Sequence, residues 1–133
     1  MPTTAALTIR DRSTDGKINN EFVINFPVEE VTVRELISTR VSEEVDKHNI
    51  DLTKTFQGLI QPSDTEVTLN GFRLKKNKKV NKKEQIKKAL DAFYTNQLIV
   101  LINKTQAEDL DDVIRITPNT VVTFLKLVPL VGG

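Results

Sequence analysis

The chain of 133 residues contains no cysteine and no tryptophan, and it has one histidine and five glycines. Without cysteine there is no disulfide, no thiolate metal site and no cysteine nucleophile, which fits a reducing cytosol. No apolar run approaches the ~18 residues that a membrane-spanning helix needs, and residues 1–10 lack the basic stretch and apolar core of a signal peptide. We therefore expect a cytoplasmic protein without a membrane segment.

Charge of one sign is also lacking, because 19 Lys and Arg residues balance 18 Asp and Glu residues, for a net charge of +1. Such a balance gives no global field that would attract nucleic acid. The segment Lys75–Lys88 does hold eight lysines, which could neutralise phosphates. Few aromatic residues for base stacking lie nearby, and a lysine run is more often a solvated surface. We do not expect a nucleic-acid partner.

Residues that carry catalysis or bind metals are scarce as well. His48 is the only histidine, and with no second ligand near it a histidine at the exposed end of a helix is expected. Asp109, Asp111 and Asp112 do not have the spacing of a calcium-binding loop, so they indicate an acidic turn. Neither a phosphate-binding glycine loop nor a G-x-S-x-G elbow occurs. We expect no enzyme activity, no metal and no cofactor.

Hydrophobic patterning predicts a hairpin followed by a helix in the first part of the chain. Ala6–Arg10 and Glu21–Phe26 alternate in polarity, and the turn Ser13–Lys17 contains Asp-Gly. Thr32 and Glu35 form a capping box. A stripe of apolar residues then recurs at helical spacing as far as His48: Val33, Leu36, Ile37, Val41 and Val45.

The later part of the chain predicts an α+β fold rather than a purely helical one. A second helix is expected over Lys82–Tyr94, with a capping box at Asn81 and Glu84 and an apolar stripe of Ile86, Ala89, Leu90 and Phe93. The expected strands are Glu66–Leu69, Phe72–Leu74, Gln97–Ile102, Val113–Ile116 and Val121–Val128.

The most specific feature is the C-terminal segment Leu127-Val128-Pro129-Leu130-Val131-Gly132-Gly133. Two of the five glycines stand at its end, and without Cβ atoms they permit a narrow, extended backbone that fits an enzyme channel. Pro129 favours an extended conformation at Val128. Since a frayed end is usually polar, the apolar residues Leu127–Val131 indicate recognition by a partner.

The order of elements and this tail resemble ubiquitin-like β-grasp proteins, most closely bacterial ones. The likeness covers most of the chain: the hairpin Ala6–Phe26, the helix Val31–His48 and the strands Gln97–Ile102 and Val121–Val128 take the expected places in order. It implies a β-grasp domain over residues 1–128, an insertion at about residues 50–88 after the first helix, and an exposed diglycine tail at residues 129–133.

The resemblance also implies a function as a protein modifier. An activating enzyme would use ATP to adenylate the Gly133 carboxylate, and a conjugating enzyme would carry it as a thioester to an amine or hydroxyl of a target. A metal-dependent isopeptidase would reverse the attachment. All of these catalysts lie on other chains. Gly133 is then the acyl donor, and the partners would recognise Gly132, Val131, Leu130, Pro129 and Leu127.

Two departures from ubiquitin qualify this resemblance. Leu130 and Val131 stand where ubiquitin has basic character, so eukaryotic activating enzymes are doubtful partners, and the insertion has no counterpart in ubiquitin. A sulfur carrier of the same fold, ending in a thiocarboxylate at Gly133, and a non-covalent β-grasp adaptor remain alternatives.

The last strand offers a possible partner patch at Val122, Phe124 and Leu125. Its pattern leaves two arrangements open. Either Val122 and Phe124 face the core while the outward residues are Thr123, Leu125 and Leu127, or the reverse.

Overall fold

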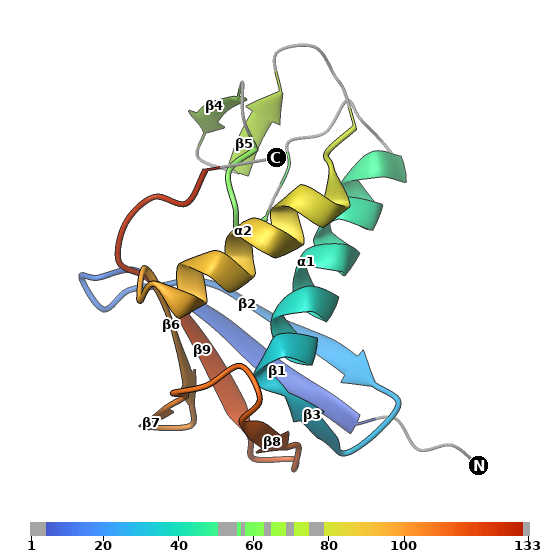
Figure 1. Ribbon diagram of the computed structural model, residues 1–133, viewed down its shortest axis with the longest axis vertical. Helices are drawn as coiled ribbons and strands as arrows, with labels where there is room; N and C mark the ends of the chain where they lie inside the picture. The colour runs from blue at the N-terminus through green and yellow to red at the C-terminus, as the bar shows by residue number, and fades with distance from the viewer. Residues whose placement is uncertain are drawn as a thin grey trace. The chain divides into compact units, whose positions relative to one another are not determined.

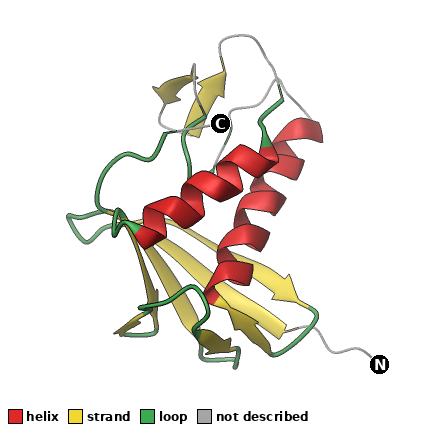
Figure 2. Ribbon diagram, viewed as in Figure 1, coloured by secondary structure: helices red, strands yellow, loops and turns green. Residues whose placement is uncertain are grey.

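The computed structural model describes residues 5–50, 56, 58–62, 65–68, 71–74 and 79–131. These residues form an α+β fold, as expected (Figures 1 and 2). The chain divides into two compact units: unit 1 comprises Met1–Leu36 and Phe93–Val128, and unit 2 comprises Ile37–Ala92 and Pro129–Gly133. The sequence predicted one domain over residues 1–128 and a separate tail, whereas Ile37–Ala92 here forms a unit together with the tail. No helix among the described residues is both long and apolar enough to cross a membrane.

Unit 1 is built on a five-stranded sheet with the strand order β2-β1-β9-β6-β7. Its strands are β1 (Ala5–Arg12), β2 (Ile18–Phe26), β6 (Leu98–Ile102), β7 (Thr105–Gln106) and β9 (Val121–Lys126). The first and last of these strands, β1 and β9, run parallel, whereas every other neighbouring pair is antiparallel. In Figure 1 these strands lie side by side, so the sheet brings together segments that are far apart in the sequence.

The predicted turn between β1 and β2 is confirmed. The Gly16 N–H donates to the Ser13 carbonyl over 2.9 Å, and Gly16 has φ +87°, a conformation that glycine adopts without strain. The Asp15 carboxylate accepts the Lys17 N–H at 3.0 Å and also contacts the Ser13 hydroxyl. The turn therefore fixes the register of the hairpin.

Alternating side chains of this sheet form an apolar core. Leu7 is paired with Ile24 across β1 and β2, and Val100 with Phe124 across β6 and β9. Each of these four side chains is at most 2% exposed. Since successive residues of a strand point to opposite faces, the pairing places one apolar face of all four strands in the same core.

Two short strands were not expected from the sequence. β3 (Glu30–Thr32) pairs antiparallel with β8 (Val113–Arg115), and β7 pairs with β6 where only a turn was predicted. Both unexpected strands are three residues long or shorter, so they carry too few residues for a visible alternation. Their positions depend on pairing with distant segments.

Unit 2 contains most of both helices and the antiparallel pair β4 (Thr65–Thr68) and β5 (Gly71–Leu74). Helix α1 spans Val33–Ile50 and helix α2 spans Lys82–Tyr94. Both predicted caps are confirmed. The Thr32 hydroxyl accepts the Glu35 N–H at 3.1 Å, and the Asn81 side-chain oxygen accepts the Glu84 N–H at 3.1 Å.

The predicted buried face is confirmed for α1 and only in part for α2. All five predicted apolar residues of α1 are at most 1% exposed. In α2, Ala89 and Phe93 are buried as expected, but Ile86 and Leu90 are only half-buried, while Gln85 and Ala92 are at most 2% exposed. The buried stripe of α2 is therefore rotated from the predicted one, because Gln85 takes an interior position.

Candidate functional site

The strand that leads to the tail is an interior strand of the sheet of unit 1. β9 is hydrogen-bonded to β1 on one side and to β6 on the other. Val122 is 0% exposed and Phe124 is 1% exposed, whereas Leu125 is half-buried. Of the two arrangements left open by the sequence, the structure has Val122 and Phe124 in the core. Thr123 is also largely shielded, at 5% exposure.

The predicted partner patch is consequently wrong for two of its three residues. Val122 and Phe124 fill the core and offer no surface to a partner. Leu125 lies on the opposite face, in register with the half-buried Ile99 of β6. Because successive side chains of a strand point to opposite faces, only Leu125 of the three lies on the face away from this core. An apolar surface on β9 therefore involves Leu125 and its neighbours across the sheet.

The residues that directly follow β9 are exposed. The strand ends at Lys126, two residues earlier than predicted. The Leu127 N–H donates to the Gln97 carbonyl over 2.9 Å, and the side chains of Leu127 and Val128 are 42% and 44% exposed. Leu127 is therefore exposed, and its recognition by a partner stays a prediction.

Within the described residues, one side chain of the tail is buried and its backbone is hydrogen-bonded. Pro129 is exposed and Val131 is 44% exposed, but Leu130 between them is only 3% exposed. The Gln61 N–H donates to the Leu130 carbonyl over 2.7 Å, and Gln61 forms a parallel bridge with Val131. The expected exposure of the tail is thus corrected at Leu130. The acyl donor Gly133 and its neighbour Gly132 lie outside the described residues.

The segment that receives the tail, Gly58–Pro62, is itself fixed within unit 2. Leu59 and Ile60 are 2% and 0% exposed. The Leu59 N–H donates to the Glu44 carboxylate over 3.3 Å, and the same carboxylate oxygen lies 3.3 Å from Arg40 Nε. Arg40 is only 1% exposed although it is charged. A buried charge needs a partner, and Glu44 supplies it, while the bond from the Leu59 N–H to the same carboxylate ties the segment to α1.

Sequence reasoning missed Gln61, Glu44 and Arg40 as residues associated with the tail. Gln61 acts through its backbone N–H, which any residue except proline supplies. Arg40 and Glu44 stand four residues apart on a helix, a spacing that is common on exposed helix surfaces. The one available signal was the apolar pair Leu59-Ile60 in an otherwise irregular stretch.

His48 lies in the interior rather than at the surface expected from the sequence. Its side chain is 6% exposed, and its ring meets that of Phe56 edge-to-face at 5.3 Å between centroids. Among the described residues, neither ring nitrogen has a hydrogen-bond partner. The apolar stripe of α1 therefore extends to the helix end, and His48 serves there as a packing residue.

The lysine-rich region falls partly outside the described residues, which exclude Lys75, Lys76 and Lys78. Of the others, Lys82 Nζ lies 2.6 Å from the Asp46 carboxylate, while Lys79 and Lys83 are exposed. The Lys82 pair joins α2 to α1 within unit 2. One lysine of the run thus has a structural partner instead of being wholly available to phosphates.

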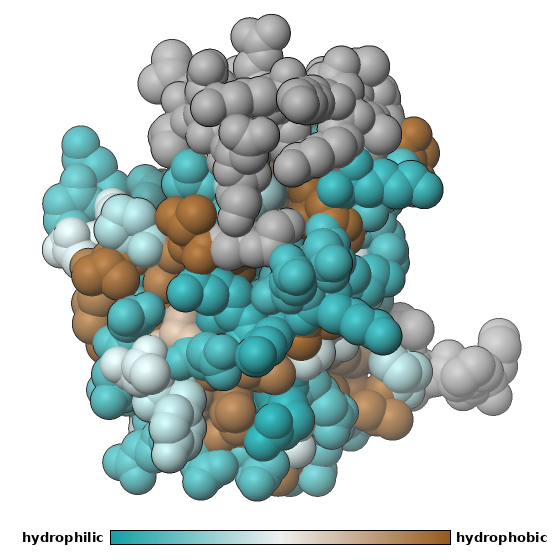
Figure 3. Space-filling view, turned by 45° about the horizontal axis from the view of Figure 1, so that its top comes forward, coloured by the Kyte–Doolittle hydropathy of each residue, from teal (hydrophilic) through white to brown (hydrophobic). Residues whose placement is uncertain are grey.

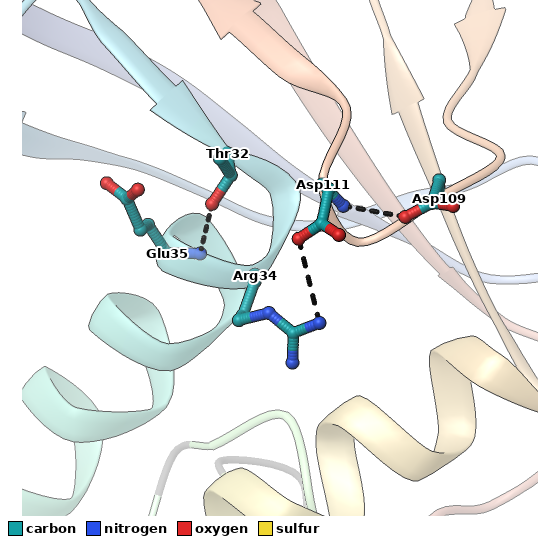
Figure 4. Close-up of polar contacts among 5 residues, drawn as sticks. All are labelled: Thr32, Arg34, Glu35, Asp109 and Asp111. Carbon is teal, nitrogen blue, oxygen red and sulfur yellow. Dashed lines mark hydrogen bonds and ion pairs between the residues drawn. The ribbon is translucent and has the colours of Figure 1, made fainter.

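The acidic turn predicted at Asp109–Asp112 is confirmed by its hydrogen bonds. Asp112 accepts the N–H groups of Glu108 and Asp109, and Asp109 accepts the Asp111 N–H at 2.8 Å. Figure 4 shows Arg34 of α1 directed at Asp111, with 3.7 Å between the charged atoms. These carboxylates stabilise the loop beside the first turn of α1. In the described part of the chain, no group of three or more His, Cys, Asp or Glu residues could hold a metal ion.

The exposed apolar residues do not lie on one element. They include Ile18, Val23, Val28, Tyr94, Val113 and Leu127. The face in Figure 3 is mostly hydrophilic, with hydrophobic residues in small separate patches. Small dispersed patches are ordinary on a folded protein, so the tail and the segment that receives it are the most distinctive local arrangement. Comparison of the chain with protein-family models, curated proteins and solved structures found no match.

Proposed function

We propose that this chain is a ubiquitin-like protein modifier with a β-grasp fold, and that Gly133 is its acyl donor. The observation that carries the proposal is the path of the last strand: β9 lies inside the sheet between β1 and β6 and leads directly into the apolar segment that ends in Gly132-Gly133. A firmly held strand followed by a thin extended end can present a terminal carboxylate to another protein.

The topology of unit 1 supports the β-grasp part of the proposal. A hairpin, β1-β2, is followed in sequence by helix α1, and the sheet order β2-β1-β9-β6-β7 places the first strand parallel to the last. This is the strand order of a ubiquitin-like sheet. The pair β4-β5 and most of α2 then belong to an insertion between α1 and β6.

The chemistry follows from the terminal carboxylate. Its oxygen attacks the α-phosphorus of ATP, pyrophosphate leaves, and an acyl adenylate forms. A cysteine thiolate of the activating enzyme then displaces AMP to give a thioester, which passes to a conjugating enzyme. Attack by an amine or hydroxyl of a target finally releases the thiol. This chain supplies the acyl group and a recognition surface, and the catalysts belong to its partners.

The experiment is reconstitution with an activating enzyme and a conjugating enzyme of the ubiquitin-like class from the same genome. Full-length protein should form covalent conjugates, and removal of Gly132 and Gly133 should abolish them because the acyl donor is then a branched, bulkier residue. Val28→Ser, an exposed change in unit 1, is the matched control and should conjugate normally. Conjugates that persist without the two glycines would exclude the proposal.

Mass spectrometry of the natural C-terminus separates the modifier from a sulfur carrier. A target peptide joined to the Gly133 carbonyl supports the modifier, whereas replacement of one carboxylate oxygen by sulfur supports the carrier. A non-covalent adaptor would retain its activity after deletion of the tail. Mass spectrometry at Gly133 and deletion of the tail together give a different result for each of the three alternatives.

A further inference from the structure

The C-terminal tail occupies a defined position on its own chain. Leu130 is 3% exposed between an exposed Pro129 and a Val131 that is 44% exposed. That alternation is expected when an extended segment lies along a surface and inserts every second side chain. The contact is made by backbone as well, through the 2.7 Å bond from the Gln61 N–H to the Leu130 carbonyl and the parallel bridge to Val131.

The receiving segment is anchored independently of the tail. At one end, the Phe56 N–H donates to the Phe72 carbonyl over 2.7 Å, and the Phe72 N–H returns a bond of 2.6 Å. Gly58 lies so close to the Phe56 ring that a Cβ at this position would clash with it. Farther along, Leu59 is bound to Glu44 of α1. Loss of the tail would therefore leave the position of Gly58–Pro62 largely intact.

We infer that Gly58–Pro62 is a binding site for Leu130 and Val131 of the chain's own C-terminal tail, and that these residues must leave this closed form before Gly133 is activated. The site takes an extended apolar segment by strand addition, with Leu130 buried and its carbonyl bonded to the Gln61 N–H. The inference about activation rests on the proposed function, because only an activating enzyme needs the carboxylate.

The closed form has a direct energetic consequence. An enzyme channel that must surround the residues before Gly133 cannot bind them while Leu130 is buried and its carbonyl is bonded to Gln61. Binding is then restricted to the fraction of molecules with a released tail, and the apparent affinity falls by that fraction. The same leucine would be needed by both sites, so the enzyme competes with Gly58–Pro62.

Trimming by a carboxypeptidase measures the released fraction without any partner of the modifier. The enzyme also needs an extended end, and mass spectrometry reports the loss of the terminal glycines. Gln61→Pro removes the donor N–H without changing the tail and should speed trimming about tenfold, the size expected when roughly one good contact is lost. Gln61→Ala keeps the N–H and should trim within about twofold of the unaltered protein.

A second pair of variants keeps the inference testable if Gln61→Pro fails to fold. Leu130→Ser removes the buried apolar side chain and should speed trimming about tenfold or more, whereas Val131→Ser alters an exposed neighbour and should have little effect. Hydrogen exchange adds an independent measurement: the Gln61 amide should exchange faster once residues 129–133 are deleted. Unchanged trimming in folded Leu130→Ser, with unchanged exchange at Gln61, would overturn the inference.

The tests distinguish failure of the tail-binding site from failure of the proposed function. If trimming and exchange respond as expected but no activating enzyme adenylates Gly133, the binding site stands and the modifier function fails. If Gly133 is adenylated equally well in Gln61→Pro and Gln61→Ala, and trimming does not change, the function stands and the binding site falls.

Discussion

The hydrogen bonds inside unit 1 differ in part from those inside unit 2. In unit 1, β9 pairs with β1 from Val121 to Leu125 and with β6 from Val122 to Lys126, so backbone bonds follow one another along both sides of the strand. Unit 2 also has backbone pairing, in β4-β5 and at Phe56 and Gln61, but side chains link other segments of it to backbone groups. The Asn49 amide accepts the Val80 N–H at 2.9 Å and donates to the Val80 carbonyl at 3.2 Å, and Glu44 holds Leu59.

The difference determines what a substitution can remove. A side-chain change in the sheet leaves the backbone ladder in place, so its cost comes from lost packing. In unit 2 one substitution can remove the link between two segments. Stability in unit 1 should therefore follow burial, whereas stability in unit 2 should follow the identity of a few polar residues.

The largest effect is expected from Phe124→Ala in the core of unit 1. The side chain is 1% exposed, and truncation of a buried phenylalanine costs about 4 kcal/mol of unfolding free energy. Leu125→Ala, half-buried on the opposite face of the same strand, should cost about 1 kcal/mol. Urea unfolding followed by circular dichroism measures both. Equal losses would contradict the assignment of faces on β9.

Glu44→Ala should have the next largest effect, and it concerns unit 2. The change removes the carboxylate that contacts the buried Arg40 guanidinium and the Leu59 N–H, each at 3.3 Å. Breaking one side of a buried ion pair costs about 3 kcal/mol. Glu43→Ala, at the neighbouring exposed position, should stay within about 0.5 kcal/mol. If the two alanine variants unfold at the same urea concentration, the buried pair does not stabilise unit 2.

The two helix caps allow a smaller and more direct comparison of the units. Asn81→Ala removes the acceptor of the Glu84 N–H at the start of α2 and should cost about 1 kcal/mol. Thr32→Ala should cost about 0.5 kcal/mol, because carbonyls of Asp112 and Leu110 also accept N–H groups in the first turn of α1.

Both caps have a conservative control that keeps the side-chain acceptor. Asn81→Asp and Thr32→Ser should retain most of the stability of the unaltered protein in the same urea titration. A Thr32→Ala loss larger than that of Asn81→Ala would show that the loop carbonyls do not supplement the cap.

The smallest effect is expected at the exposed turn of unit 1. Hydrogen bonds from the Ser13 hydroxyl and then from the Lys17 backbone lower the pKa of Asp15 below its ordinary value. Because the folded pKa is the lower one, the stabilisation is present above the unfolded pKa and is lost as the pH falls through the folded pKa. An NMR titration of the Asp15 carboxyl carbon measures it. Ser13→Ala should raise this pKa towards the ordinary value, and an unchanged midpoint would refute the stated cause.

The sequence allowed more of unit 1 to be predicted than of the tail site. Alternation predicted β1 and a short apolar run predicted β6, each within two residues of its bounds, and capping residues marked the start of both helices, because these signals are local. The parallel pairing of β1 with β9 follows from no local pattern. Burial of Leu130 depends on Gln61, which is far away in sequence and acts only through its backbone. Any residue except proline can donate a backbone N–H, so no residue type in the sequence indicates such a contact.

The position of β9 between β1 and β6 also governs the order in which this protein can fold. Residues 121–126 leave the ribosome after the strands on either side of them have been made, yet they join those strands into one sheet. Until then the hairpins β1-β2 and β6-β7 each present an unpaired edge. Closure of the sheet therefore waits for a long-range contact, which slows folding and lengthens the time during which nascent chains can associate.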